Sequence, residues 1–315
     1  MGGFLGFCYR QLTYRPHPLP TSASLKGQTA LITGANSGLG LEAARELAAH
    51  KLSRLILAVR DASKGEAAKK SILATSPECA VEVWSLDHES YDSIAEFGKR
   101  VAALDRIDYA LLNAGVKKLE YSASSSTGHE LNVQVNHIGT SAVSLAVLPV
   151  LRNTARKVNS PTRLTIVSSE GHFWIPFKEQ SAPDILKRMD DKETFGTAMQ
   201  RYYTSKLLNV LWARELASKV SPEEVVINTV NPGFCYSGLH RHESTGIIKI
   251  FLWMLGWSSV QGGHCLTDAL VQHRDSHGEY FSEQRQVPPS SFVLSPQGQN
   301  AQKKIWQETI ALLKE

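Results

Sequence analysis

Tyr202 and Lys206 are four residues apart, so a helix would present both side chains on one face. A phenol with an ordinary pKa of about 10 exchanges protons poorly near neutral pH unless a neighbouring cation lowers that pKa. Lys206 would supply such a cation. The pair therefore predicts acid–base chemistry, for example protonation of the alkoxide that forms when hydride is added to a ketone. Ordinary surface helices also carry Tyr and Lys at this spacing, so the prediction needs support from other motifs.

Two serines stand where an apolar run ends: Ser168 closes the run of residues 163–168 and Ser169 follows it. A hydroxyl at the carboxyl end of a strand can reach a substrate carbonyl, polarise it and orient it. Such a group would complement a proton donor at Tyr202. From the residues alone, either serine could take this place.

A glycine-rich turn, Thr-Gly-Ala-Asn-Ser-Gly-Leu-Gly at residues 33–40, separates a predicted strand from a predicted helix. Glycines allow close backbone approach, and the unpaired N–H groups of a helix N-terminus attract a phosphate. The spacing is one residue different from the GxGxxG fingerprint, and no Gly-Lys-Ser/Thr follows as in a P-loop. The turn therefore favours a dinucleotide over a nucleoside triphosphate. The alternative is that the glycines only shape a tight turn.

Runs rich in Val, Ile and Leu alternate with segments whose apolar residues recur at helical spacing. The runs predict strands buried on both faces, at residues 28–33, 54–59, 80–86, 108–113, 163–168 and 225–230. The segments between them predict helices, at residues 39–50, 64–74, 90–103, 131–151 and 202–219. This alternation is typical of an α/β fold with a Rossmann-type, doubly wound parallel sheet.

We expect a single domain over residues 26–315, preceded by an N-terminal extension of residues 1–25. Residues 170–201 and 232–260 interrupt the alternation, and loops of this length in a compact domain are usually functional. Ligands of open α/β sheets bind beyond the carboxyl ends of the strands. We therefore expect these insertions to form a substrate lid. The apolar stretch Ile247–Trp257 fits either the lid or a plain core helix.

Taken together, the motifs resemble the short-chain dehydrogenase/reductase family over about residues 26–313. The resemblance is carried, in chain order, by the TGxxxGxG turn, Asn113-Ala114-Gly115, Asn136, Tyr202-Tyr203-Thr204-Ser205-Lys206, Asn231-Pro232-Gly233 and Glu279-Tyr280-Phe281-Ser282. The branch looks like the retinol-dehydrogenase-like reductases, and especially the fungal members of secondary metabolism.

The resemblance implies catalytic roles for Asn136, Ser169, Tyr202 and Lys206. Tyr202 would be the proton donor, and Lys206 would lower the pKa of Tyr202 and hold the ribose hydroxyls. Asn136 would kink its helix and hold a water behind the lysine, although a helix Asn can also simply bond to backbone. Alignment to the family favours Ser169 over Ser168. The 33 residues from Ser169 to Tyr202 exceed the spacing of the compact members.

The resemblance also implies which residues contact a nicotinamide dinucleotide. They are Gly34, Asn36, Ser37, Gly38, Leu39, Gly40, Arg60, Asp87, Asn113, Ala114, Gly115, Tyr202, Lys206, Pro232, Gly233 and Ser237.

Three of these residues bear on the choice of cofactor. Val59 stands where the NAD users of the family carry Asp, and Arg60 can bind a 2′-phosphate through two N–H groups, which favours NADP(H). Arg60 could instead only cap the sheet edge, and Ser37 stands where many NADP users have a basic residue. Asp87 matches the Asp that contacts adenine in the family, and it could equally be a turn or capping residue.

Composition excludes several other classes of protein. The 315 residues are 42% hydrophobic and 20% charged, and the net charge of +4 is spread along the chain, which argues against a nucleic-acid partner. The four cysteines form no CxxC pair, so a reducing compartment fits best. We expect no metal site, no signal peptide and no transmembrane segment, because the apolar runs are too short. Peripheral membrane association stays open.

These observations predict a cytoplasmic, NADPH-dependent oxidoreductase that interconverts a hydrophobic ketone or aldehyde with its alcohol, in natural-product biosynthesis. Reduction is the expected direction. Two alternatives stay open: an enzyme of this fold that catalyses a non-redox isomerisation or cyclisation, and an NADP(H)-sensing binding protein. Family members often form homodimers through the helix that carries Tyr202, and the apolar Leu207, Leu208, Val210 and Leu211 suit either a homodimer or a buried monomer helix.

Overall fold

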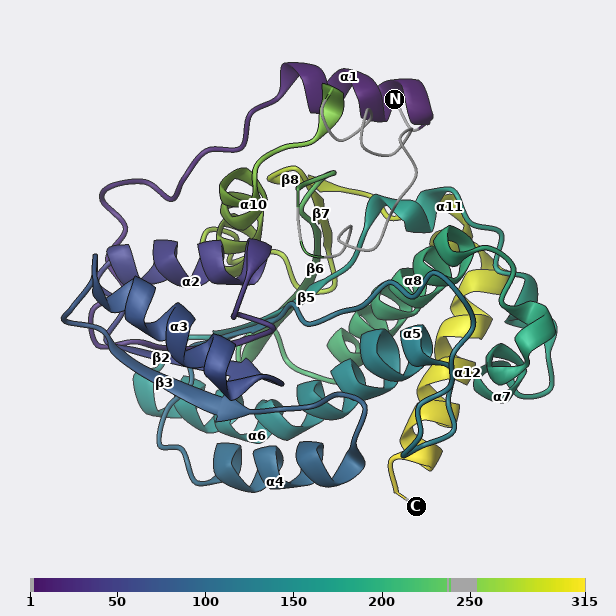
Figure 1. The fold of residues 1–315 in the computed structure, drawn as a ribbon, viewed down its shortest axis with the longest axis horizontal. Coiled ribbons are helices and arrows are strands. Elements are labelled where there is room, and N and C mark those ends of the chain that lie inside the picture. The colour runs from purple at the N-terminus through teal and green to yellow at the C-terminus, as the bar shows by residue number, and fades with distance from the viewer. Residues whose placement is uncertain (1–2, 237, 239–253, 315) are drawn as a thin grey trace.

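The computed structural model describes residues 3–236, 238 and 254–314, which form one eight-stranded sheet with helices on both faces (Figure 1). The strand order is β3-β2-β1-β4-β5-β6-β7-β8, with β8 antiparallel to β7 and every other neighbouring pair parallel. The strands are β1 (Thr29–Thr33), β2 (Arg54–Val59), β3 (Ala80–Ser85), β4 (Tyr109–Leu112), β5 (Thr162–Val167), β6 (Val225–Asn231), β7 (Tyr280–Ser282) and β8 (Arg285–Val287).

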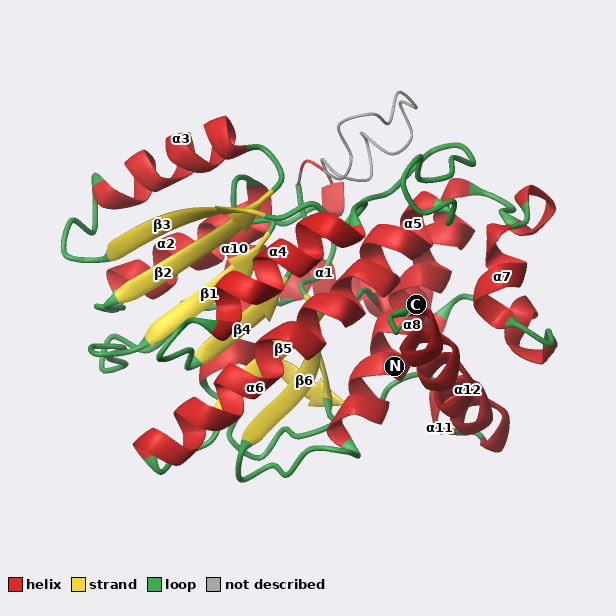
Figure 2. Ribbon diagram, turned by 90° about the horizontal axis from the view of Figure 1, so that it is seen from below, coloured by secondary structure: helices red, strands yellow, loops and turns green. Residues whose placement is uncertain are grey.

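Helices cover both faces of the sheet, and further helices lie beyond the carboxyl ends of its strands (Figure 2). The longer ones are α1 (Phe4–Thr13), α2 (Gly38–Ala49), α3 (Ala62–Leu73), α4 (Tyr91–Ala102), α6 (Thr140–Val158), α8 (Ala198–Ala217), α10 (Ser259–Val271) and α12 (Pro296–Leu312). The shorter ones are α5 (Leu131–Val133), α7 (Ile185–Asp190) and α11 (Ser291–Leu294).

Burial on both faces explains why the strands appear as unbroken apolar runs. Every residue of β1 is buried, and alternate side chains enter different cores. Ala30 and Ile32 pack with residues of α2 and α10, whereas Leu31 packs on the opposite face with residues of α4 and α6. The predicted doubly wound α/β fold is confirmed, with the strand order reversing between β1 and β4.

Each predicted strand and helix is present, and the structure adds elements that the sequence did not predict. The predicted helix 131–151 runs from α5 through a π-helical turn, Gln134–Gly139, into α6 and continues to Val158. The unpredicted α10 contains Gly262 and Gly263, which normally weaken a helix. An added Cβ at Gly262 would lie 2.8 Å from Leu39 Cγ, and one at Gly263 would lie 2.8 Å from Glu42 Cβ, both in α2. These glycines let α10 pack closely against α2.

Two insertions, residues 170–201 and 232–260, interrupt the alternation of strands and helices, and the structure describes the first completely and the second in part. Residues 170–201 form short helical elements: a 3₁₀ turn at Glu170–Phe173, a second at Lys178–Ser181, α7, and a third at Lys192–Thr194. Of residues 232–260 the structure describes the two ends. Ser237 and most of the stretch Ile247–Trp257 lie outside the described residues.

One helical stretch, Leu131–Val158, has the length and apolar composition to cross a membrane, and 78% of its most apolar window is buried in the protein. It therefore has the position of a core helix. The apolar side chains on α8 are also buried within this chain: Leu207 and Leu208 pack in a cluster with residues of α7 and α12. From the sequence, these side chains suited either a homodimer interface or the core of a monomer, and here they lie in the core.

Candidate active site

The glycine-rich turn lies at the carboxyl end of β1, where the strand order reverses. Gly34 has a φ of 66°, which glycine adopts without strain, and its N–H donates to the Ala58 carbonyl at 2.8 Å. α2 begins at Gly38, and the side chain of its N-cap residue Ser37 makes no capping hydrogen bond. The N–H groups of the first turn, together with the helix dipole, suit this end of α2 for a phosphate.

Asn113 holds this turn against the end of β4. Its Nδ2 donates to the carbonyls of Thr33, at 3.0 Å, and Gly34, at 3.2 Å, and its backbone N–H donates to Thr33 Oγ1. The N–H of Ala114 donates to the same hydroxyl. Gly40 leaves room for this arrangement, because an added Cβ would lie 2.5 Å from Asn113 Nδ2 and 2.7 Å from the Gly34 carbonyl oxygen.

Asn136 lies in the π-helical turn and connects two segments of the site. Its Nδ2 donates to the Val116 carbonyl at 2.9 Å and to Ser205 Oγ at 2.8 Å, and its Oδ1 accepts from the Val116 N–H at 2.7 Å. The amide therefore joins the loop after β4 to α8. Such π-turns are frequent at functional sites. An added Cβ at Gly115 would lie 3.1 Å from Asn136 Oδ1 and 3.2 Å from Lys206 Nζ, so a side chain there would crowd both groups.

Lys206 is buried on α8, and its ammonium donates to the Val167 carbonyl at the end of β5, at 2.9 Å. Burial lowers the pKa of Lys206 to about 8. The pKa of the neighbouring Tyr202 phenol is raised, first by burial and then by Tyr203, while a hydrogen bond with Ser169 opposes the rise. The sequence suggested that Lys206 would lower the pKa of Tyr202; in this arrangement burial dominates and keeps the phenol protonated.

The structure distinguishes the two serines. Ser168 Oγ donates to the Lys206 carbonyl at 2.9 Å and is buried, so its hydroxyl ties β5 to α8. Ser169 caps the 3₁₀ turn that follows, and its hydroxyl accepts from the Gly171 N–H at 3.2 Å and bonds with Tyr202. Ser169 therefore contacts Tyr202, while Lys206 reaches the end of β5 and Asn136 bonds to Ser205, the residue before Lys206.

Arg60 and Asp87 lie just beyond the ends of β2 and β3, which are neighbouring strands. Arg60 is 63% exposed, and its Nη1 is 2.8 Å from Glu89 Oε1. Asp87 Oδ1 accepts from the Glu89 N–H at 3.0 Å, which is the turn role that its sequence left open. Among the described residues, none donates a hydrogen bond to Asp87 Oδ2.

Pro232 and Gly233 follow β6 at the same edge of the sheet. Gly233 has a φ of 81°, and an added Cβ would lie 2.6 Å from the Trp257 ring. The backbone of Cys235 pairs with Trp257 as an isolated β-bridge, which closes the two described ends of this insertion against each other. Ser237, the remaining predicted cofactor contact, lies outside the described residues.

The helix α1, which the sequence did not indicate as part of a site, lies across this edge (Figure 1). Gln11 is buried, and its Nε2 donates to the carbonyls of Phe234, at 3.0 Å, and Leu255, at 2.9 Å. The Trp257 indole donates to the Gln11 carbonyl at 2.9 Å. The helix therefore binds both described ends of the second insertion. From the sequence we expected only an N-terminal extension over residues 1–25.

Arg10 on α1 forms a second link, to the residue after Ser169. Its guanidinium bonds with Glu170 and donates from Nε to Glu283 Oε2 at 2.7 Å. Burial raises the pKa of Glu170 to about 7, and the charge of Glu283 adds to the rise while Arg10 opposes it. Two buried carboxyl groups thus share one cation beside the turn that follows Ser169.

Within the part of the chain that the structure describes, no group of three or more His, Cys, Asp and Glu side chains has an arrangement that could hold a metal. The four cysteines are free.

Comparison with known proteins gives close relatives. The short chain dehydrogenase family model matches residues 28–172. The short chain dehydrogenase sol3 of Alternaria solani is 57% identical over 284 residues, which cover 90% of this chain and 99% of that protein. The short chain dehydrogenase/reductase mfmJ of Annulohypoxylon moriforme is 36% identical over 311 residues, which cover 97% of this chain and 90% of that protein.

Solved structures share the fold. The Pseudomonas aeruginosa RhlG/NADP active-site complex aligns with a TM-score of 0.63 at 20% identity and covers 84% of this chain and 97% of that one. A short-chain dehydrogenase from Sphingobium yanoikuyae in complex with NADPH aligns with a TM-score of 0.56 at 20% identity, covering 77% and 82%.

Replacement of Gly40 by Ala should lower the free energy of unfolding by roughly 1–3 kcal/mol, because the new methyl group would press on Asn113 and on the backbone of Gly34. Gly98→Ala in α4 is the matched control: its Cβ would lie 3.6 Å from Ala146 Cβ, an ordinary contact, and should raise stability by about 0.5–1 kcal/mol. Urea unfolding of both variants measures the difference. A Gly40→Ala protein as stable as the wild type would contradict the assigned close approach.

Replacement of Glu170 by Gln should flatten the pH dependence of stability. A carboxyl pKa raised to about 7 means that the folded chain holds this proton more tightly than the unfolded chain, so stability declines as pH rises from about 4.5 to 7. Removal of the group should eliminate a decline on the order of 3 kcal/mol. Urea unfolding at pH 5 and pH 8 tests this. Arg10→Met should steepen the decline, and an unchanged slope in Glu170→Gln would refute the assignment.

Proposed function

The chain belongs to the short-chain dehydrogenase/reductase family, and we propose that it is an NADPH-dependent reductase of a hydrophobic ketone or aldehyde. The observation that carries this proposal is that Ser169 bonds with Tyr202 while Lys206, four residues further along α8, reaches the end of β5 at the same edge of the sheet. A protonated phenol and a free hydroxyl are what reduction of a carbonyl requires from the protein.

The residues around the turn fit a dinucleotide. Gly34 and Gly40 let the turn pack closely against Asn113 and Ala114, and Ser37 leaves the first turn of α2 without a side-chain cap, so its N–H groups could bind a pyrophosphate. Lys206 would hold the ribose hydroxyls, beside Gly115. When bound, the reduced nicotinamide supplies hydride to the substrate.

The protein would supply the proton and the orientation. Ser169 would donate a hydrogen bond to the substrate carbonyl and polarise it, and Tyr202 would protonate the oxygen as negative charge develops there. Lys206 would stabilise the phenolate that Tyr202 leaves, since its ammonium lies one helical turn away on α8. Asn136 would position this lysine through the loop at Val116 and through Ser205, and would keep a water for reprotonation.

Reduction is the proposed working direction, because NADPH is the proposed cofactor. Tyr202 carries its proton at neutral pH, as the acid in a reduction must, and Lys206 would ease the release of that proton.

Arg60 supports the choice of NADPH over NADH. Its guanidinium is largely exposed at the end of β2, where the 2′-position of the adenosine ribose binds in folds of this type. Its pair with Glu89 is solvent-accessible and worth only about 0–1 kcal/mol, so a 2′-phosphate can displace it at little cost. Two of the aligned structures contain NADP or NADPH.

Natural-product biosynthesis is the proposed setting, by analogy with the fungal relatives, and the cytoplasm is the proposed compartment, because the cysteines are unpaired.

Tyr202→Phe should reduce turnover by roughly 10²–10⁴-fold while NADPH affinity stays within a few-fold, because only the proton donor is lost. Tyr203→Phe, which removes the adjacent hydroxyl on the same helix, is the matched control and should retain turnover. Single-turnover NADPH oxidation with a panel of hydrophobic ketones and a metabolite extract, with products read by mass spectrometry, measures both. Retained turnover in Tyr202→Phe would disprove the acid assignment; a product of unchanged mass without NADPH loss would indicate the non-redox enzyme.

Arg60→Ala should weaken NADPH binding by roughly 10- to 100-fold and leave NADH binding nearly unchanged, because the phosphate loses a charged hydrogen-bond donor. Arg54→Ala is the control, since Arg54 pairs with Glu82 at the opposite end of the same strand. Glu89→Gln should strengthen NADPH binding by removing a nearby negative charge. Fluorescence titration with each dinucleotide tests these effects, and equal losses for both in Arg60→Ala would count against NADPH specificity.

A further inference from the structure

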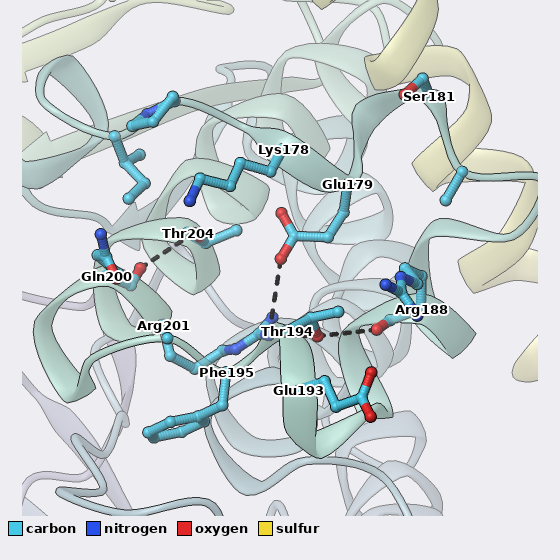
Figure 3. Close-up of a pocket in the computed structure, with 14 residues that line it drawn as sticks. Lys178, Glu179, Ser181, Arg188, Glu193, Thr194, Phe195, Gln200, Arg201 and Thr204 are labelled. Atoms are coloured by element: carbon cyan, nitrogen blue, oxygen red, sulfur yellow. Dashed lines mark hydrogen bonds and ion pairs between the residues drawn. The ribbon is translucent and has the colours of Figure 1, made fainter.

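A hollow of about 420 Å³ lies beside the first turns of α8, between that helix and the segment that follows Ser169 (Figure 3). Arg201 and Thr204 line it from α8. At 100° per residue these two side chains leave the helix on the side away from Tyr202 and Lys206. The hollow is therefore separate from the proposed reduction site, although it shares a helix with that site.

Arg201 is the unusual feature of this hollow. Its side chain is only 1% exposed, and its Nη2 donates to Thr194 Oγ1 at 2.9 Å and lies 3.6 Å from Glu179 Oε1. Its Nε and Nη1 are buried and have no hydrogen-bond partner among the described residues. A buried cation with unmet donors is costly, and the usual remedy is an acceptor supplied by a bound molecule or by water.

Charges of both signs surround Arg201. The carboxylates of Glu179, Glu130 and Asp190 oppose the lowering of its pKa by burial, so a bound anion depends on further cations around the hollow. Lys178 lines the hollow, is exposed and has no ion pair with any described residue. In Figure 3 its ammonium extends over Thr204. The third cation, Arg188, is already paired with Asp191 at 2.7 Å. The N-terminus of α8, whose dipole is positive, borders the same space.

The walls also set the kind of anion. Glu179 and Glu193 line the hollow beside the cations, so a doubly charged group would meet repulsion, whereas a single carboxylate needs only one guanidinium edge. Ile175, Pro176 and Phe195 contribute apolar surface. An apolar body attached to a carboxylate would use both kinds of surface.

We propose that this hollow is a binding site for a small organic acid, whose carboxylate accepts hydrogen bonds from Arg201 and pairs with Lys178 while its apolar body lies against Ile175, Pro176 and Phe195. The wall at residues 175–182 continues directly from the turn of Ser169, and Arg201 precedes Tyr202. If the proposed reduction is correct, an occupied site braces both catalytic segments and alters turnover; the binding itself does not depend on that function.

Octanoate is the probe, and isothermal titration calorimetry with the full chain is the measurement. We expect octanoate to bind in the presence of saturating NADPH, with 1-octanol and inorganic phosphate at least about ten-fold weaker. Equal binding of octanoate and 1-octanol overturns the carboxylate contact, tighter binding of phosphate overturns the organic acid, and competition with NADPH places the probe in the cofactor site. Absence of binding overturns the proposal.

Variants assign the binding to this hollow. Arg201→Met should weaken octanoate binding by roughly ten-fold or more, and the replacement of a buried charge by an apolar side chain of similar length should fold. Lys178→Ala lies on the surface and carries the test if Arg201→Met does not fold; it should weaken binding several-fold. Lys192→Ala, a nearby exposed lysine that does not line the hollow, should bind as the wild type does. Undiminished binding in Lys178→Ala and in a folded Arg201→Met overturns the site.

Single-turnover NADPH oxidation with and without saturating octanoate separates the two parts of the proposal. A changed rate in the wild type and not in Lys178→Ala supports the bracing of the catalytic segments. An unchanged rate with octanoate bound overturns the bracing, while calorimetry still decides the site. A chain with no NADPH oxidation at all contradicts the proposed reductase and leaves the calorimetric result unaffected.

Discussion

The side-chain amide of Asn136 joins two parts of the chain: the loop that leaves β4 and the middle of α8. It accepts from one backbone N–H of Val116, donates to the carbonyl of that residue and donates to Ser205. Because Lys206 follows Ser205, the same amide sets how close the ammonium lies to Gly115. The π-helical turn is the local distortion that brings this side chain to both partners, and the site is built outward from that junction.

Burial has the same electrostatic effect on several groups around this junction. Tyr202 keeps its proton, the pKa of Lys206 falls to about 8, and the pKa of Glu170 rises to about 7. Each shift moves a group toward its neutral form, as desolvation requires. A nearby opposite charge works against burial, as Arg10 does when it lowers the pKa of Glu170. Such partners therefore decide which buried groups stay charged. Fixed hydrogen bonds act strongly in such surroundings because little water screens them.

The sequence predicted the sheet and most helices because local patterns determine them: unbroken apolar runs for strands buried on two faces, and helical spacing between them. It also pointed to Tyr202, Lys206 and the glycine turn, whose residue types are dictated by local geometry. It did not predict α10, because its glycines are explained only by the approach of α2. The residue types alone did not separate Ser168 from Ser169, and only the resemblance to the family favoured Ser169; the bond from Ser168 to α8 is a tertiary contact. The sequence also could not show that Arg201 is buried with unmet donors.

The position of α1 has a consequence for how the protein is made. Arg10 meets Glu283, 273 positions later in the chain, and Gln11 meets the backbone at Phe234 and Leu255. During synthesis these partners leave the ribosome 223 to 273 residues after their contacts on α1, so the apolar side chains of α1 stay uncovered until those later segments have emerged. Contacts of such long separation form late because a large loop must close first. The beginning of the chain is thus among the last pieces to reach its final place.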